Sequence, residues 1–118
     1  MDATSPETAD ATPVVTDNPA RSRYEVHFGG EFAGYVVYDL RGRQIDLIHT
    51  EVNPRFQGAG LASHLARFSL DDARARKLAV LPTCPYVRSW IRKHPDYADL
   101  VPDDRRAEFG VRPHAEAT

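Results

Sequence analysis

The sequence contains a single cysteine, Cys84, so no disulfide can form within the chain. It also lacks any run of about 18 apolar residues, the length that a membrane-spanning helix needs. No basic segment followed by an apolar core opens the sequence, so we expect no secretory signal. Together these absences predict a protein of the reducing cytoplasm.

An excess of charge of one sign is also missing. The 15 basic and 17 acidic residues leave a formal net charge of -2, which argues against nucleic acid or a membrane surface as the partner. The histidines show no spacing typical of metal ligands, so we expect no metal. The 118 residues suffice for one small domain, which we expect to be a monomer or a weak homodimer.

Both ends of the chain are poor in large apolar side chains. Residues 1–20 are rich in Thr, Ala, Asp and Pro and could not bury enough surface to offset the entropy of ordering. We therefore expect a disordered tail over 1–20, a folded domain over 21–103 and a flexible tail over 104–118. Phe109 and Val111 would dock at most weakly.

The folded part begins with patterns typical of β-structure. Residues 23–28 alternate between polar and apolar, and 32–40 and 44–52 are rich in apolar and aromatic side chains, which predicts three strands. Short glycine-containing turns separate them, so we expect an antiparallel meander. In the third strand the apolar residues change parity between Leu47 and Ile48, which indicates a β-bulge or a strand covered on both faces.

The second half of the domain predicts a βαβ unit. Apolar residues at helical spacing favour a helix from Leu61 to about residue 77. The apolar segment 78–82 then predicts a buried strand parallel to the third one. Pro85 fits the first turn of a second helix, which we expect to end near His94. The predicted fold class is therefore mixed α+β.

A loop with two glycines joins the third strand to the first helix. Gly58 and Gly60 leave room for a ligand near the helix N-terminus, where unpaired N–H groups and the helix dipole favour a phosphate. Arg55 adds a positive charge. Taken alone, the loop is as consistent with a simple tight turn, because it lacks the third glycine of a dinucleotide fingerprint and the Lys-Ser/Thr pair of a P-loop.

Three separated motifs together resemble the GNAT superfamily of acetyltransferases. Arg55-x-x-Gly58-x-Gly60 matches the Gln/Arg-x-x-Gly-x-Gly/Ala signature of that superfamily. Its short YjdJ-type branch of minimal domains is similar in three strings: His49-Thr50-Glu51-Val52, Gln57-Gly58-Ala59-Gly60-Leu61-Ala62 and Cys84-Pro85-Tyr86. The resemblance extends from about Tyr24 to Val101.

The resemblance implies an N-acetyltransferase that uses acetyl-CoA as co-substrate and an amine as acceptor. The sheet would be splayed open between its third and fourth strands, with the pantetheine arm in the opening and the pyrophosphate on the amides of the glycine loop. The second helix would lie on the far side of the cofactor. The implied cofactor-binding residues are Glu51, Val52, Asn53, Arg55, Gln57, Gly58, Ala59, Gly60, Leu61, Pro85, Tyr86, Ser89, Arg92 and Lys93.

Three side chains could carry the proton transfers. His49 and Glu51 are two residues apart on a strand, so they share a face about 7 Å apart, and either could act as general base. An imidazole is the better match to neutral pH. Cys84 would cap the second helix, whose dipole favours a thiolate, and could protonate the leaving thiolate or accept the acetyl group as a thioester. Purely structural roles stay open for all three.

Two other functions compete with the enzyme. A non-catalytic module that binds CoA or acyl-CoA would need the glycine loop but no base. A protein-interaction domain that has lost the ligand is disfavoured because the loop is intact. The presence of His49 and Cys84 favours the enzyme, while the identity of the acceptor amine is not indicated.

Overall fold

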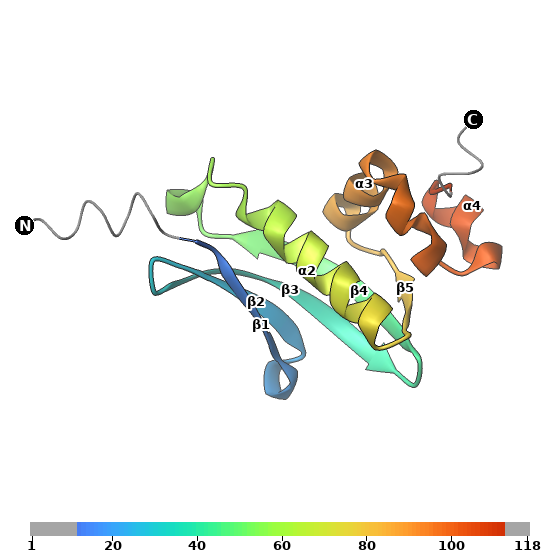
Figure 1. The fold of residues 1–118 in the computed structure, drawn as a ribbon, viewed down its shortest axis with the longest axis horizontal. Coiled ribbons are helices and arrows are strands. Elements are labelled where there is room, and N and C mark those ends of the chain that lie inside the picture. Colours follow the sequence, from blue (N-terminus) through green and yellow to red (C-terminus); the bar gives the residue numbers. More distant parts are fainter. Residues whose placement is uncertain (1–11, 113–118) are drawn as a thin grey trace, which may run out of the picture.

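A computed structural model describes residues 12–112, which form a five-stranded sheet in the order β1-β2-β3-β4-β5 (Figure 1). The strands are β1 (Val14–Asn18), β2 (Arg23–Phe28), β3 (Glu31–Arg41), β4 (Gln44–Val52) and β5 (Ala79–Leu81). The first four are antiparallel neighbours, and β5 joins β4 in parallel. The predicted mixed α/β fold, with a meander followed by a βαβ unit, is confirmed.

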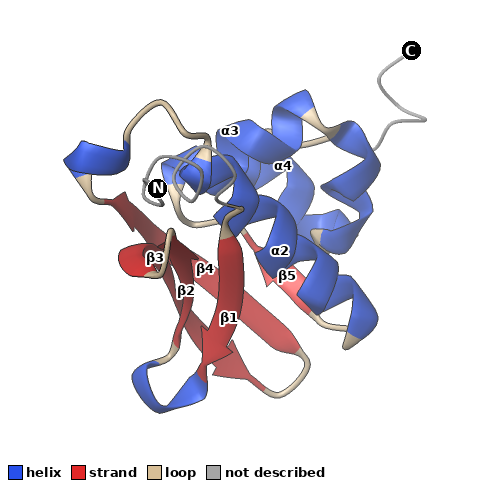
Figure 2. Ribbon diagram, turned by 60° about the vertical axis from the view of Figure 1, so that its left-hand side comes forward, coloured by secondary structure: helices blue, strands red, loops and turns tan. Residues whose placement is uncertain are grey.

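The helices lie on one side of this sheet (Figure 2). They are α2 (Leu61–Ala75), α3 (Pro85–Lys93) and α4 (Arg106–Phe109), with 3-10 turns at Pro19–Arg21, Pro54–Phe56, Pro95–Leu100 and Asp103–Arg105. Between the layers the core buries Tyr24, Val36, Ile45, Leu47, Leu65, Leu70 and Ile91. Within residues 12–112, no helix covers the opposite face of β2, β3 and β4 (Figure 2), and no helix is long and apolar enough to cross a membrane.

The parity change in β4 is a β-bulge, the first of the two predicted alternatives. Val37 of β3 pairs with His49, and the next pair is Tyr38 with Leu47, so Ile48 is an extra residue without a partner across the ladder. Before the bulge, Leu47 points into the core and is fully buried, whereas Ile48 is 39% exposed. The bulge therefore resets which side chains of β4 face the helices.

The expected N-terminal tail is wrong over its second half. Residues 14–18 form β1, which pairs along its whole length with β2. The Tyr38 hydroxyl donates to Asp17 Oδ1 at 2.7 Å, and the Asn18 amide donates to Glu25 at 3.0 Å. These polar residues are held by hydrogen bonds rather than by burial, which a prediction from composition cannot detect. Residues 1–11 of the expected tail lie outside the described residues.

The expected C-terminal tail is also wrong for residues 104–112. Phe109 and Val111 are 7% and 2% exposed, so both belong to the core. Arg92 of α3 fixes this segment by donating to the carbonyl oxygens of Phe109 at 2.7 Å and Gly110 at 3.0 Å. Two apolar anchors and one guanidinium thus dock a segment whose other residues are polar or small. Residues 113–118 lie outside the described residues.

The role of β1 can be tested at Asp17. Replacing Asp17 with Ala leaves the hydroxyl of the buried Tyr38 without its acceptor. A buried donor without a partner costs about 1–3 kcal/mol, so we expect the free energy of unfolding to fall by that amount in urea titrations. Thr16→Ala, at an exposed position of the same strand, should change it by less than about 0.5 kcal/mol. Equal effects of the two substitutions would contradict the contact.

Candidate functional site

The sheet opens between β4 and β5. The two strands pair only where Gln44–Asp46 meets Ala79–Leu81. The backbone N–H of Cys84 then donates to the carbonyl oxygen of Leu47 at 2.8 Å, directly before the bulge. Beyond this point β4 has no partner on that side among the described residues, which is the splayed arrangement expected from the resemblance.

The backbone of Val52 faces this opening. The N–H of the next residue, Asn53, donates to the carbonyl oxygen of Ala33 at 2.8 Å. This bond lies one residue beyond the last β3–β4 pair, Gly34 with Val52. Backbone groups of successive strand residues point to opposite edges. The peptide groups of Glu51 and Asn53 therefore point toward β3, and of the three residues predicted to pair with an extended ligand, Val52 is the one whose N–H and C=O are available.

A groove of about 270 Å³ lies where the opening meets the glycine loop. Its lining consists of Val52, Phe56, Gln57, Gly58, Gly60, Leu61, Ala62, Ser63 and Tyr86. Gly58 and Gly60 have φ of +92° and +73°, conformations that side chains disfavour. The first hydrogen bond of α2 runs from the His64 N–H to the Gly60 carbonyl at 3.2 Å. The N–H groups of the helical residues before His64 therefore have no partner within the helix, and they lie next to the groove.

The groove is suited to an anionic ligand through its backbone rather than through Arg55. The Arg55 guanidinium pairs with Glu31 at 2.8 Å and packs over the Phe56 ring at 4.9 Å. Arg55 does not line the groove, whereas Gln57, Gly58 and Gly60 do. The predicted anion site therefore depends on amide N–H groups and on the dipole of α2.

Helix α3 closes the groove from the other side with Tyr86. Burial raises the pKa of the Tyr86 phenol, and a hydrogen bond with Ser63 of α2 offsets part of this rise. The phenol therefore stays protonated at neutral pH and can donate a hydrogen bond. Ser63 also accepts a hydrogen bond from the Trp90 indole at 2.9 Å, which ties α3 to α2 beside the groove.

The other residues predicted on α3 lie outside the groove. Arg92 is engaged with the C-terminal segment, as described above, and it borders a separate cavity together with Pro95 and Arg112. Ser89 is half-buried and Lys93 is exposed, and neither lines the groove. Helical spacing alone could not distinguish the face of α3 that meets α2 from the face that meets α4.

Cys84 occupies the N-cap position of α3, directly after Pro82 and Thr83, and is 2% exposed. Its Sγ lies 3.3 Å from Oγ1 of Thr50, the first side chain of β4 beyond the bulge that points to the helix side. Thr50 was not predicted as a site residue. The sequence signal that identifies it is the parity change at the bulge. Because side chains two residues apart share a face of a strand, Thr50 and Val52 both point to the helix side beyond the bulge.

His49 and Glu51 lie on the opposite face of β4. Their side chains are 56% and 55% exposed, and Nε2 of His49 is 2.8 Å from Oε1 of Glu51. Glu51 as acceptor requires the proton on Nε2, which leaves Nδ1 as the basic nitrogen of a neutral ring. The three predicted catalytic side chains thus flank one opening, with Cys84 on the helix side and the His49–Glu51 pair on the open side.

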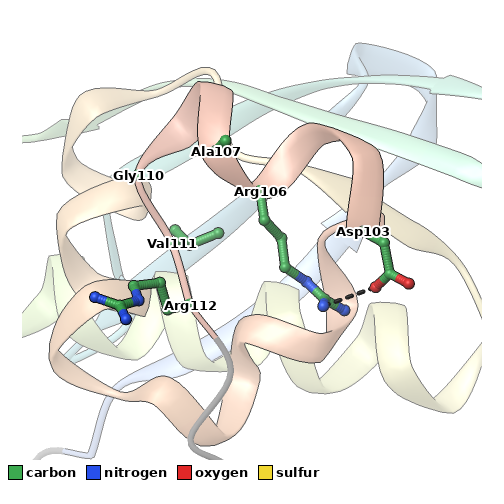
Figure 3. Close-up of a pocket in the computed structure, with 6 residues that line it drawn as sticks. All are labelled: Asp103, Arg106, Ala107, Gly110, Val111 and Arg112. Atoms are coloured by element: carbon green, nitrogen blue, oxygen red, sulfur yellow. Dashed lines mark ion pairs between the residues drawn. The ribbon is translucent and has the colours of Figure 1, made fainter. Parts of the chain in front are cut away.

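A larger cavity, of about 630 Å³, lies at the C-terminal end of the fold (Figure 3). It is lined by Asp103, Arg106, Ala107, Gly110, Val111 and Arg112. Arg106 is neutralised by Asp103 at 2.7 Å and donates to the Val101 carbonyl at 2.9 Å. None of the predicted site residues lines this cavity, so the groove beside the glycine loop is the better candidate despite its smaller volume.

Comparisons with known proteins give a family match and several relatives. A sequence model of the family described as GCN5-related N-acetyl-transferase matches residues 23–100. Protein NATD1 of Xenopus tropicalis is 31% identical over 77 residues, covering 64% of this chain and 71% of that protein. Protein NATD1 of Mus musculus is 32% identical over 77 residues, with shares of 64% and 70%. Protein NATD1 of Homo sapiens is 36% identical over 61 residues, with shares of 51% and 54%. The match of the family model spans the opening, the glycine loop and α3, and the chain therefore belongs to the GCN5-related N-acetyltransferase family.

Proposed function

We propose that this protein transfers the acetyl group of acetyl-CoA to a primary amine. Membership of the family supports acetyl transfer in general. The observation that carries the specific proposal is the opening of the sheet beside the glycine loop, with a buried thiol on one side and an exposed imidazole–carboxylate pair on the other. A module that only binds CoA would need neither of these.

The groove has the donors that CoA requires. The N–H groups at the start of α2 and the glycines of the loop would bind the pyrophosphate, where the helix dipole favours negative charge. The N–H and C=O of Val52 would hydrogen-bond with the amides of the pantetheine arm, which would take the place of a longer β5. The hydroxyls of Ser63 and Tyr86 are further donors at the groove.

The geometry favours direct transfer. On the open side, Nδ1 of His49 would take a proton from the acceptor amine, while Glu51 holds the ring and stabilises the charge that develops on it. On the helix side, the Cys84 thiol would give a proton to the departing sulfur. A covalent acetyl-cysteine is disfavoured because Cys84 is 2% exposed and faces Thr50, across β4 from the proposed base.

The cofactor site can be tested at Gly58. A valine there would fill the space for the pyrophosphate, and we expect the Kd for CoA, measured by calorimetry, to rise at least about tenfold. Gly42→Val is the matched control, because Gly42 also has positive φ (+59°) and open space around it, but lies in a distant hairpin. Both variants should lose stability alike. Equal loss of CoA affinity in both would contradict the assignment.

Removing the Cys84 thiol tests its role as acid. Cys84→Ala should lower kcat for amine acetylation by about 100-fold, while the Kd for CoA stays unchanged. Arg92→Met, which disrupts α3 packing without touching the groove, controls for general loosening. Intact-protein mass spectrometry after incubation with acetyl-CoA should find no acetyl group on Cys84. An unchanged kcat in Cys84→Ala would leave this residue a packing role alone.

His49 can be tested by removing its basic nitrogen. His49→Gln should lower kcat/KM by about 10²–10³, because the glutamine amide cannot take a proton from the amine. His64→Gln, at an exposed position on α2, should leave kcat/KM unchanged. An unchanged kcat/KM in His49→Gln would show that another group acts as base.

A further inference from the structure

We propose that the open face of β2, β3 and β4 docks a polypeptide acceptor, whose lysine side chain lies against Tyr35 with its ammonium group at Glu51. This inference rests on the acetyl transfer proposed above and adds the class of acceptor. It follows from the register of the strands, the charges on this face and the apolar surface around them.

The register brings the relevant side chains into rows across the sheet. Tyr35 of β3 lies between Glu25 of β2 and Glu51 of β4. In the next row Val37 lies between Arg23 and His49. Side chains opposite one another on antiparallel strands share a face about 5 Å apart. A ligand over Tyr35 would therefore contact the carboxylate of Glu51 and lie next to the proposed base.

Glu51 is the carboxylate on this face that is left to bind a cation. Glu25 is held by Arg23 at 2.7 Å and by Asn18 at 3.0 Å. The carboxylate of Asp39 is paired with an arginine at 2.8 Å. Within residues 12–112, Glu51 and Asp46 have no arginine or lysine as ion-pair partner, but Asp46 lies opposite Asp39 near the other end of β4, with one oxygen buried, so Glu51 is the one beside Tyr35. One uncompensated carboxylate fits a single ammonium group, whereas a free diamine would bring a second cation without a counter-charge.

Aromatic side chains form the surface beside Glu51. The rings of Phe32 and Tyr35 are stacked, with centroids 6.3 Å apart, and the ring centroids of Tyr35 and His49 lie 6.5 Å apart. Arg23, neutralised by Glu25, packs within 4.7 Å of the Tyr35 ring centre and fixes its orientation. An alkyl chain lying along Tyr35 would bury its methylene groups, and the ring would also attract the ammonium.

The same face exposes apolar surface that a small amine could not cover. Phe32 is 43% exposed and Ile48, the bulged residue, is 39% exposed. Phe32 lies on β3 with Tyr35, and Ile48 lies on the neighbouring β4. No described helix covers this face of β2, β3 and β4 (Figure 2). A polypeptide laid across the strands would bury this surface, which favours a lysine side chain over a free metabolite.

The transfer on this surface is balanced. The lysine ammonium gives one proton to His49, and the neutral nitrogen attacks the thioester carbon, forming the C–N bond as the C–S bond breaks. The thiolate that leaves takes a proton from Cys84, and the amide nitrogen loses its second proton to solvent. His49 then gives its proton to solvent and Cys84 takes one back, which restores both residues. The net products are acetyl-lysine, free CoA and one proton.

Binding can be measured without turnover, with the full-length protein saturated with CoA. The probes are an N-acetylated, amidated Gly-Lys-Gly peptide and the same peptide with norleucine, a neutral analogue of lysine. In NMR titrations we expect the lysine peptide to shift the amide signals of Phe32, Tyr35 and His49. It should bind about fivefold tighter than the norleucine peptide, the preference that an exposed cation–π contact and a surface ion pair supply.

Variants separate the charge from the ring. Glu51→Gln should abolish the preference for lysine over norleucine. Tyr35→Thr should weaken both peptides, while Tyr35→Phe, which keeps the ring, should bind them as the parent does. Leu40→Ala, at an exposed position near the far end of β3, should change nothing.

Several results would overturn the proposal. Equal binding of the two peptides would show that Glu51 does not select a cation, and unchanged binding by Tyr35→Thr would place the acceptor elsewhere. Cadaverine binding as tightly as the lysine peptide would replace the polypeptide with a small diamine. These outcomes concern the acceptor alone, because failure of the proposed acetyl transfer would instead appear as absence of CoA binding or of amine acetylation in the parent protein.

Discussion

One inserted residue in β4 determines on which face each side chain of the site lies. If Ile48 were paired regularly, without a bulge, the parity that buries Ile45 and Leu47 would continue, so that His49 would point into the helix layer and Thr50 would point away from it. The bulge reverses this order. It brings Thr50 to Cys84 and leaves His49 on the open face, so a donor and an acceptor of protons can flank one opening.

The opening itself begins at the same point. Cys84 closes the parallel pairing through its bond to the Leu47 carbonyl, one residue before the bulge. From there β4 continues toward the glycine loop without a partner on that side among the described residues, and Val52, whose peptide groups face the opening, borders the groove. The groove is thus made from backbone that a longer β5 would have paired, which is why a strand of three residues suits this fold better than a full-length one.

Much of this arrangement could be predicted from the sequence, and the failures have physical causes. The spacing of apolar residues predicts three strands, the parallel strand and two helices, because buried side chains recur at regular intervals in these elements. The parity change located the bulge. Strand β1 escaped prediction because Asp17 and Asn18 are held by side-chain hydrogen bonds to Tyr38 and Glu25, which are distant in the sequence. Arg55 and Arg92 stay predicted ligand contacts, but their guanidinium groups also bind Glu31 and the carbonyls of Phe109 and Gly110, contacts that depend on tertiary structure.

The C-terminal segment that was expected to be a tail also supports the site, and the small size of the domain explains why. A short chain buries little apolar surface, so the elements that hold the site must be fixed by other means. Helix α3 carries Cys84 and Tyr86 at its start and Arg92 at its end, where the guanidinium binds the carbonyls of Phe109 and Gly110. The docked C-terminal segment therefore supports the wall of the groove from behind. On the other face of the sheet no such support is present in the described part of the chain, so an acceptor bound there, as proposed, would be ordered by the surface that it buries itself.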